Sequence, residues 1–132
     1  MSTRLMLIVG TLLTAVAPMS AHHGYGGFFR PEERTVAIEG DVQSLTYANP
    51  HVVFTIQKND GSIYTVSWQS PWWVERYAGA NKDTFHVGDH LIVVGAPSRD
   101  PASHEVTLLR QVERPRDHWM WRSTAPFAKP ST

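Results

Sequence analysis

The histidines His22, His23 and His51 are the residues of this chain whose type and spacing best suit metal chemistry. His22 and His23 directly follow Ala21, a small residue after which a leader peptide can be removed. A freed His22 would present its α-amine and its ring Nδ1 to one ion, and His51 would add a third nitrogen. Such a T-shaped set of nitrogens, a histidine brace, suits Cu(II) by ligand type and by the Irving–Williams order. The sequence therefore predicts a copper site at His22 and His51, with His23 as an alternative ligand or as a supporting group.

Position along the chain favours His51 as the third ligand. Pro50 fixes the backbone just before it, and the residue opens an expected strand, where a side chain is held more rigidly than on a loop. Side chains alternate between the two faces of a strand, and His51 is one residue before Val52, which should face inward. His51 is therefore expected on the outer face, over which the N-terminal segment can fold. An ordinary interpretation stays open beside this one. The His22-His23 pair would then be a solvated chain start, and His51 would hydrogen-bond a turn.

The copper hypothesis depends on a leader peptide at residues 1–21. A basic residue precedes a mostly apolar run of thirteen residues, Leu5 to Ala17. As a helix rising ~1.5 Å per residue, this run is too short for a hydrocarbon core of ~30 Å. It predicts a signal peptide, cut after Ala21 because Pro18 would obstruct a cut after Ala17. The mature protein is then expected to be periplasmic or secreted from a bacterium, without a stable membrane anchor.

Composition excludes several classes of function. The 132 residues contain no Cys, which rules out disulfides, Cys-based zinc sites and thiol catalysis. Twelve basic and twelve acidic residues balance, so we expect no binding to nucleic acid. The chain also lacks a G-x-S-x-G turn, an H-E-x-x-H helix and a phosphate-binding glycine loop followed by Lys. We recognise no catalytic constellation and do not expect an enzyme.

The elements that must position these residues are mostly strands. Alternating apolar residues and turn residues predict five of them, at 35–47, 51–58, 62–68, 90–96 and 104–112. In the first, the apolar parity changes between Val42 and Leu45, which indicates a bulge, and Gly40 permits the bend. Ser70 followed by Pro71 predicts the start of a short helix that Gly79 ends. The three-strand, helix, two-strand order favours a mainly β fold, a small five-stranded OB-fold-like barrel with one short helix between strands three and four. A β-sandwich or an open meander is the alternative.

The domain organisation follows from these elements. Residues 22–34 form an arm of His, Gly and aromatic residues, and residues 35–112 form the barrel. Residues 113–132 are rich in Pro and lose periodicity, which predicts a loose tail that Trp119 and Trp121 can dock.

Three short motifs carry a resemblance to a known family: His22-His23-Gly24-Tyr25, Glu39-Gly40-Asp41-Val42 and Asn49-Pro50-His51. Further landmarks are Trp68, Pro71, Val87-Gly88-Asp89, Gly95-Ala96-Pro97 and Asp100. Over residues 22–112 the chain resembles an uncharacterised family of small exported bacterial proteins, in which a Ser is usual where Tyr25 stands. The resemblance implies export and an OB-like barrel, and it implies no activity.

Aromatic residues offer a second kind of site. Trp68, Trp72 and Trp73 gather where the third strand meets the helix, and Trp68 and Trp73 are the expected ligand-binding residues if rings stack on a ligand. The same rings also suit core packing, above all Trp68. Two functions therefore stay open: a copper-binding carrier or scavenger, and a metal-free interaction module for a peptide, glycan or protein partner.

Overall fold

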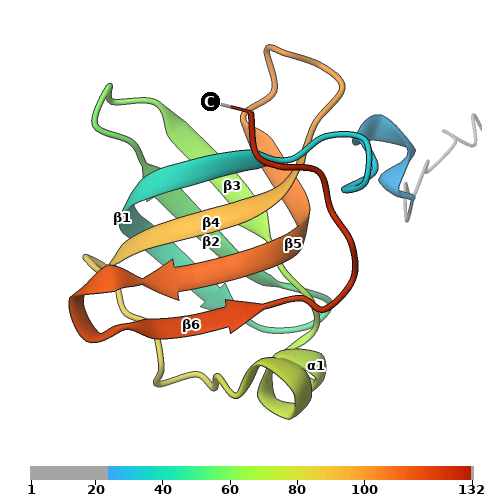
Figure 1. Ribbon diagram of the computed structural model, residues 1–132. Helices are drawn as coiled ribbons and strands as arrows, with labels where there is room; N and C mark the ends of the chain where they lie inside the picture. The colour runs from blue at the N-terminus through green and yellow to red at the C-terminus, as the bar shows by residue number, and fades with distance from the viewer. Residues whose placement is uncertain (1–23, 132) are drawn as a thin grey trace, which may run out of the picture.

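The computed structural model describes residues 24–131, and the predicted leader peptide at residues 1–21 lies outside them together with His22 and His23 (Figure 1). The elements are η1 (Tyr25–Gly27), β1 (Val36–Tyr47), β2 (Val52–Gln57), β3 (Ile63–Ser67), α1 (Pro71–Trp73), η2 (Val74–Ala78), β4 (His90–Pro97), β5 (Glu105–Arg114), η3 (Pro115–Asp117) and β6 (Trp119–Arg122). Among the described residues, no helix is both long and apolar enough to cross a membrane.

Five of the strands close into a barrel. The sheet order is β3-β2-β1-β4-β5-β6, and a further parallel pairing of β3 with β5 closes β1 to β5 into the barrel, with β6 paired outside it along β5. That pairing places Val66 opposite Val106, while all other neighbours in the sheet run antiparallel. The single short helix α1, extended by the π-helical turn η2, lies between β3 and β4 (Figure 1). The predicted fold, a five-stranded barrel with one short helix between strands three and four, is confirmed.

Strand β1 reaches around the barrel because its two halves have different partners. Its first half pairs with β4 and its second half with β2, and the register with β2 shifts between Val42 and Ser44. The sequence predicts this bulge. Before it the even-numbered residues of β1 face inward, and after it the odd-numbered ones do. Gly40 permits a close approach, because a Cβ on this residue would overlap the carbonyl oxygen of Gln57.

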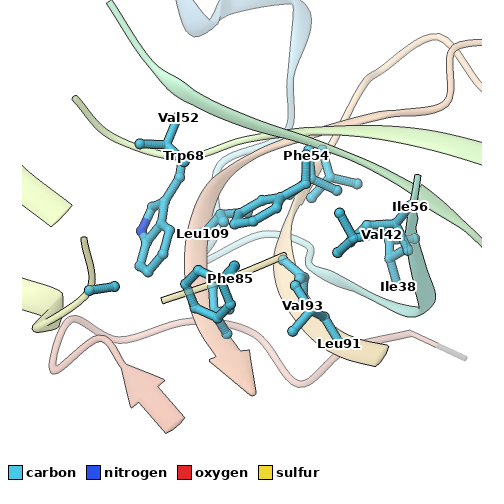
Figure 2. Packing of buried hydrophobic residues seen from close by; sticks show 14 of the residues in the cluster. Ile38, Val42, Val52, Phe54, Ile56, Trp68, Phe85, Leu91, Val93 and Leu109 are labelled. Carbon is cyan, nitrogen blue, oxygen red and sulfur yellow. The ribbon is translucent and has the colours of Figure 1, made fainter. Parts of the chain in front are cut away.

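The barrel encloses an aliphatic core that becomes aromatic toward α1. Phe54, Ile56 and Leu91 are fully buried, and each such side chain stabilises the fold by ~1.5–3 kcal/mol relative to an exposed one. Phe85 packs edge-on against Phe54, with 5.5 Å between ring centroids. Figure 2 shows Trp68 and Phe85 on one side of the cluster and Ile38, Val42 and Ile56 on the other side of Phe54.

The segment predicted to be a loose tail instead continues the fold. Strand β5 runs on to Arg114, and β6 pairs with it antiparallel through four residue pairs, one of them Val112 with Trp121. In β6 the two tryptophans are half-buried and the residues between and after them are exposed. The tail then returns to the start of the barrel, where Ser131 bridges to Val36 and the buried Thr35 hydroxyl donates 2.7 Å to the Ala128 carbonyl. Burial of the aromatic rings and these backbone contacts order a segment whose Pro content favours extended structure.

The N-terminal arm is also attached to the barrel. The Phe29 amide donates to the Pro97 carbonyl at 3.0 Å, and the Arg99 amide donates to the Gly27 carbonyl at 2.8 Å. The arm therefore packs against the connection between β4 and β5.

Candidate functional site

His51 is the member of the predicted copper set that the structure describes. It lies directly before β2, whose first residue Val52 is buried and donates its amide to the Gln69 carbonyl at 2.9 Å. The His51 side chain is half-buried, and its ring Nδ1 is inaccessible and has no hydrogen-bond partner among the described residues. Other described residues thus cover part of the ring.

The structure does not bring the predicted metal ligands together, because His22 and His23 lie outside the described residues. Within residues 24–131 there is no group of three or more His, Asp or Glu side chains arranged to hold a metal ion. The brace therefore stays a prediction. The described part of the arm packs at the β4–β5 connection, beside the start of β1, whereas His51 follows the turn at the other end of β1.

A different histidine has the most polar surroundings. The His90 ring, on the first residue of β4, is held by two carboxylates: Nδ1 lies 2.7 Å from Asp41 Oδ1 and Nε2 lies 3.0 Å from Glu39 Oε1. The hydrogen bond with Glu39 and then that with Asp41 raise the pKa of His90 above its usual value. All three side chains are substantially exposed. Because both ring nitrogens already face a carboxylate, this imidazole is suited to carry a proton and is poorly placed to bind a metal.

Sequence reasoning missed this arrangement. Glu39 and Asp41 are two residues apart in β1 and hence share a face, which was visible in the sequence. The register that places Asp41 opposite His90 joins strands distant in the chain. His86, four residues before His90, lies in a turn, where its carbonyl accepts a hydrogen bond from the Asp89 amide at 3.0 Å.

The conspicuous Val87-Gly88-Asp89 motif has a structural role. Asp89 is 4% exposed, and its carboxylate accepts a hydrogen bond from Arg114 Nη1 at 2.9 Å. Arg116 contacts its other oxygen at 3.2 Å. Burial by itself would raise the pKa of Asp89, but hydrogen bonds from the His86 amide and from Arg114 hold it below the usual value. This buried ion pair attaches the loop before β4 to the end of β5.

The predicted aromatic site is divided between core and surface. Trp68 is 3% exposed and belongs to the core, so its face is not offered to a ligand as the sequence hypothesis requires (Figure 2). Trp73 is half-buried, with its ring 5.2 Å from Tyr77 and 5.7 Å from Trp121. Trp72, which is 66% exposed, packs edge-on against Tyr77 at 6.0 Å. The surface that remains for a ligand is thus formed by Trp72, Trp73 and Tyr77.

Comparison with known proteins identifies a family and no activity. None of the curated proteins matches the chain. The model of a family of unknown function, DUF6152, matches residues 10–107, which include β1 to β4 and the first residues of β5. Because this match covers most of the sequence, the chain belongs to the DUF6152 family of unknown function.

Proposed function

We propose that this protein binds Cu(II) as an exported carrier or scavenger, with His22 and His51 as its ligands. The observation that carries the proposal is the His51 ring, whose buried Nδ1 has no hydrogen-bond partner within residues 24–131. An unsatisfied buried polar group costs ~1–3 kcal/mol, so a native protein that keeps one invites a functional explanation. An ion cannot reach the inaccessible Nδ1, so the nitrogen of this half-buried ring that would bind Cu(II) is Nε2, which is not among the buried atoms.

The N-terminal histidine supplies the remaining nitrogens. Removal of residues 1–21 would expose the α-amine of His22 beside its own ring, and such an amine titrates near pH ~7.7–8.0. It can therefore lose its proton to a metal at neutral pH, and binding should release protons. His23 is an alternative ligand or a group that orients the others. Export is part of the proposal, because without cleavage after Ala21 this chelate does not form.

The test is a Cu(II) titration of the processed protein that begins at His22. Calorimetry against a competing chelator gives the affinity, and the paramagnetic resonance spectrum reports the nitrogen ligands. We expect one Cu(II) per chain, and binding about tenfold or more weaker in His51→Ala and in a version whose His22 α-amine is acetylated. Acetylation removes the amine ligand, whereas one extra N-terminal Ala would place His23 third in the chain and create a different Cu(II) chelate. His86→Ala is the matched control, because His86 is exposed and lies in a turn. Equal affinity in all four proteins, or a mature N-terminus other than His22 in mass spectrometry of the exported protein, contradicts the proposal.

A second candidate function rests on the exposed rings of Trp72 and Tyr77. Adjacent exposed aromatic side chains stack readily on sugar rings or on an aromatic peptide side chain. This interaction module would need no metal. Titration with maltohexaose, followed by tryptophan fluorescence, tests its glycan form. Saturable quenching that Trp72→Ala removes would support this second function, and its absence would contradict it. Unchanged Cu(II) affinity in the same variant would show that the two sites are separate.

A further inference from the structure

A cavity of about 570 Å³ opens between the start of β1, the end of β2, the start of β3 and the β4–β5 connection. The side chains that matter for its chemistry are Phe29, Arg34, Val36, Lys58, Tyr64 and Arg99. Its volume is typical of small-molecule sites, which measure ~300–1,000 Å³ and are common at the mouths of β-barrels. Neither the copper site nor the Trp72 surface includes any of these residues.

One wall of the cavity is an aromatic ring with a cation above it. Lys58 Nζ lies 5.5 Å from the centroid of the Tyr64 ring. His104 stacks against Tyr64 with 4.6 Å between centroids and 10° between the ring planes. The ammonium group is therefore held near the cavity by the ring face, and the ring itself is supported by its neighbour.

A second aromatic ring in the lining, that of Phe29, has two guanidinium groups over it. The Phe29 ring has Arg34 Cζ at 5.2 Å from its centroid and Arg99 Cζ at 4.6 Å. Arg99 also forms an ion pair with Glu33 at 3.3 Å, while Arg34 and Lys58 form no ion pair with any residue that the structure describes. Two cations at this cavity thus lack a carboxylate partner.

The acidic side chains that line the cavity already have other partners. Asp100 Oδ1 accepts a hydrogen bond from the Ala102 amide at 2.9 Å, and Glu105 Oε2 accepts one from the Ser103 hydroxyl at 2.7 Å. Both contacts stabilise the β4–β5 connection. Both carboxylates keep their negative charge, and Arg34 and Lys58 are the cations at the cavity without an ion pair that an incoming anion can pair with.

From these contacts we infer that the barrel mouth binds a small organic anion: a carboxylate whose charge pairs with Arg34 and Lys58 and whose apolar body lies against Phe29 and Tyr64. The lining of the cavity contains both features, and Val36 adds a further apolar side chain to it. This site is independent of the proposed copper site, and each can be present without the other.

Benzoate is the probe for the test, with two partial analogues. The processed protein, labelled with ¹⁵N, is titrated with benzoate, with benzyl alcohol, which keeps the ring without the charge, and with acetate, which keeps the charge without the ring. We expect saturable amide shifts for benzoate at residues such as Tyr64 and Ser98, and affinities for the two analogues about threefold or more weaker.

Two variants and a control locate the charge contact. Lys58→Gln and Arg34→Gln should each weaken benzoate binding by about threefold or more, the size expected of an exposed ion pair. Arg76→Gln, at an exposed cation on η2, should leave it unchanged. The amide spectra of the variants show that each is folded. Benzoate binding that is not saturable, equals that of benzyl alcohol, or survives both cavity variants overturns the inference.

Discussion

The indole ring of Trp121 packs against that of Trp68, with 5.2 Å between their centroids, although the two residues come from β6 and from the residue after β3. Trp119, on the same face of β6 as Trp121, packs edge-on against Phe85 with 4.9 Å between ring centroids. Strand β6 thereby covers the aromatic end of the barrel core and is an integral part of the fold.

Replacing Trp121 with Ala should lower the free energy of unfolding by about 3 kcal/mol, the usual cost of removing a large packed aromatic ring. Met120→Ala is the matched control, because Met120 lies between the two tryptophans and faces solvent. Urea denaturation followed by fluorescence measures both. Equal stability of the Trp121 variant and the wild type would contradict the role assigned to β6.

Replacing Arg114 with Met should cost about 3 kcal/mol of stability at neutral pH, because it leaves the Asp89 carboxylate buried with one partner fewer. Arg116→Met should cost less than about 1 kcal/mol, since the Arg116 side chain is 64% exposed. Chemical denaturation of both variants at pH ~7 makes the comparison. A loss of similar size in the two would show that the buried pair has no special weight.

The same ion pair predicts that the stability of the protein depends on pH in the acidic range. The pKa of Asp89 is below its usual value in the folded protein. The ionised carboxylate therefore adds to the free energy of unfolding at a pH above its pKa in the unfolded chain. This addition is lost as the pH falls through its pKa in the folded protein. We therefore expect the difference between wild type and Asp89→Asn to shrink as the pH approaches ~3. A stability difference between wild type and Asp89→Asn that stays constant from neutral to acidic pH would contradict this prediction.

His90 predicts the opposite pH dependence. Its pKa is raised by Glu39 and Asp41, so the folded state holds the proton more tightly and gains stability below the unfolded pKa. This gain disappears as the pH rises through the folded pKa. His90→Gln should thus lose a few tenths of a kcal/mol near pH ~5.5 and nothing near pH ~9, because exposed ion pairs are weak. His86→Gln is the matched control, and its free energy of unfolding should differ from that of the wild type by the same amount at both pH values.

Gly40 should tolerate no side chain. Gly40→Ala is expected to cost about 2 kcal/mol or more, because the new methyl group would overlap the Gln57 carbonyl and force the strands apart. Gly26→Ala is the control, since a Cβ there meets nothing within 4 Å. Thermal unfolding monitored by circular dichroism compares the two. A Gly40 variant as stable as the Gly26 variant would contradict the close approach of β1 and β2.

Local pattern was sufficient for most of the fold. The sequence correctly predicts features that depend only on neighbouring residues. Examples are the alternation within β2, the turn at Asn59-Asp60-Gly61 and the start of the helix at Ser70-Pro71. The Ser70 hydroxyl does accept from the Trp73 amide, at 3.3 Å, as a helix cap. The bulge in β1 follows the same logic, because a change of apolar parity needs an extra residue.

The sequence by itself determined a single mainly β barrel without cysteine chemistry, because period-2 patterns and composition are properties of short segments. The tertiary structure decided which side chains meet: Asp41 with His90, Trp121 with Trp68, and Arg34 and Lys58 at one cavity. These contacts depend on the register of strands far apart in the chain and on the return of the tail to the barrel. A shift of one residue in either strand would turn every side chain to the other face, and no local pattern contains that information.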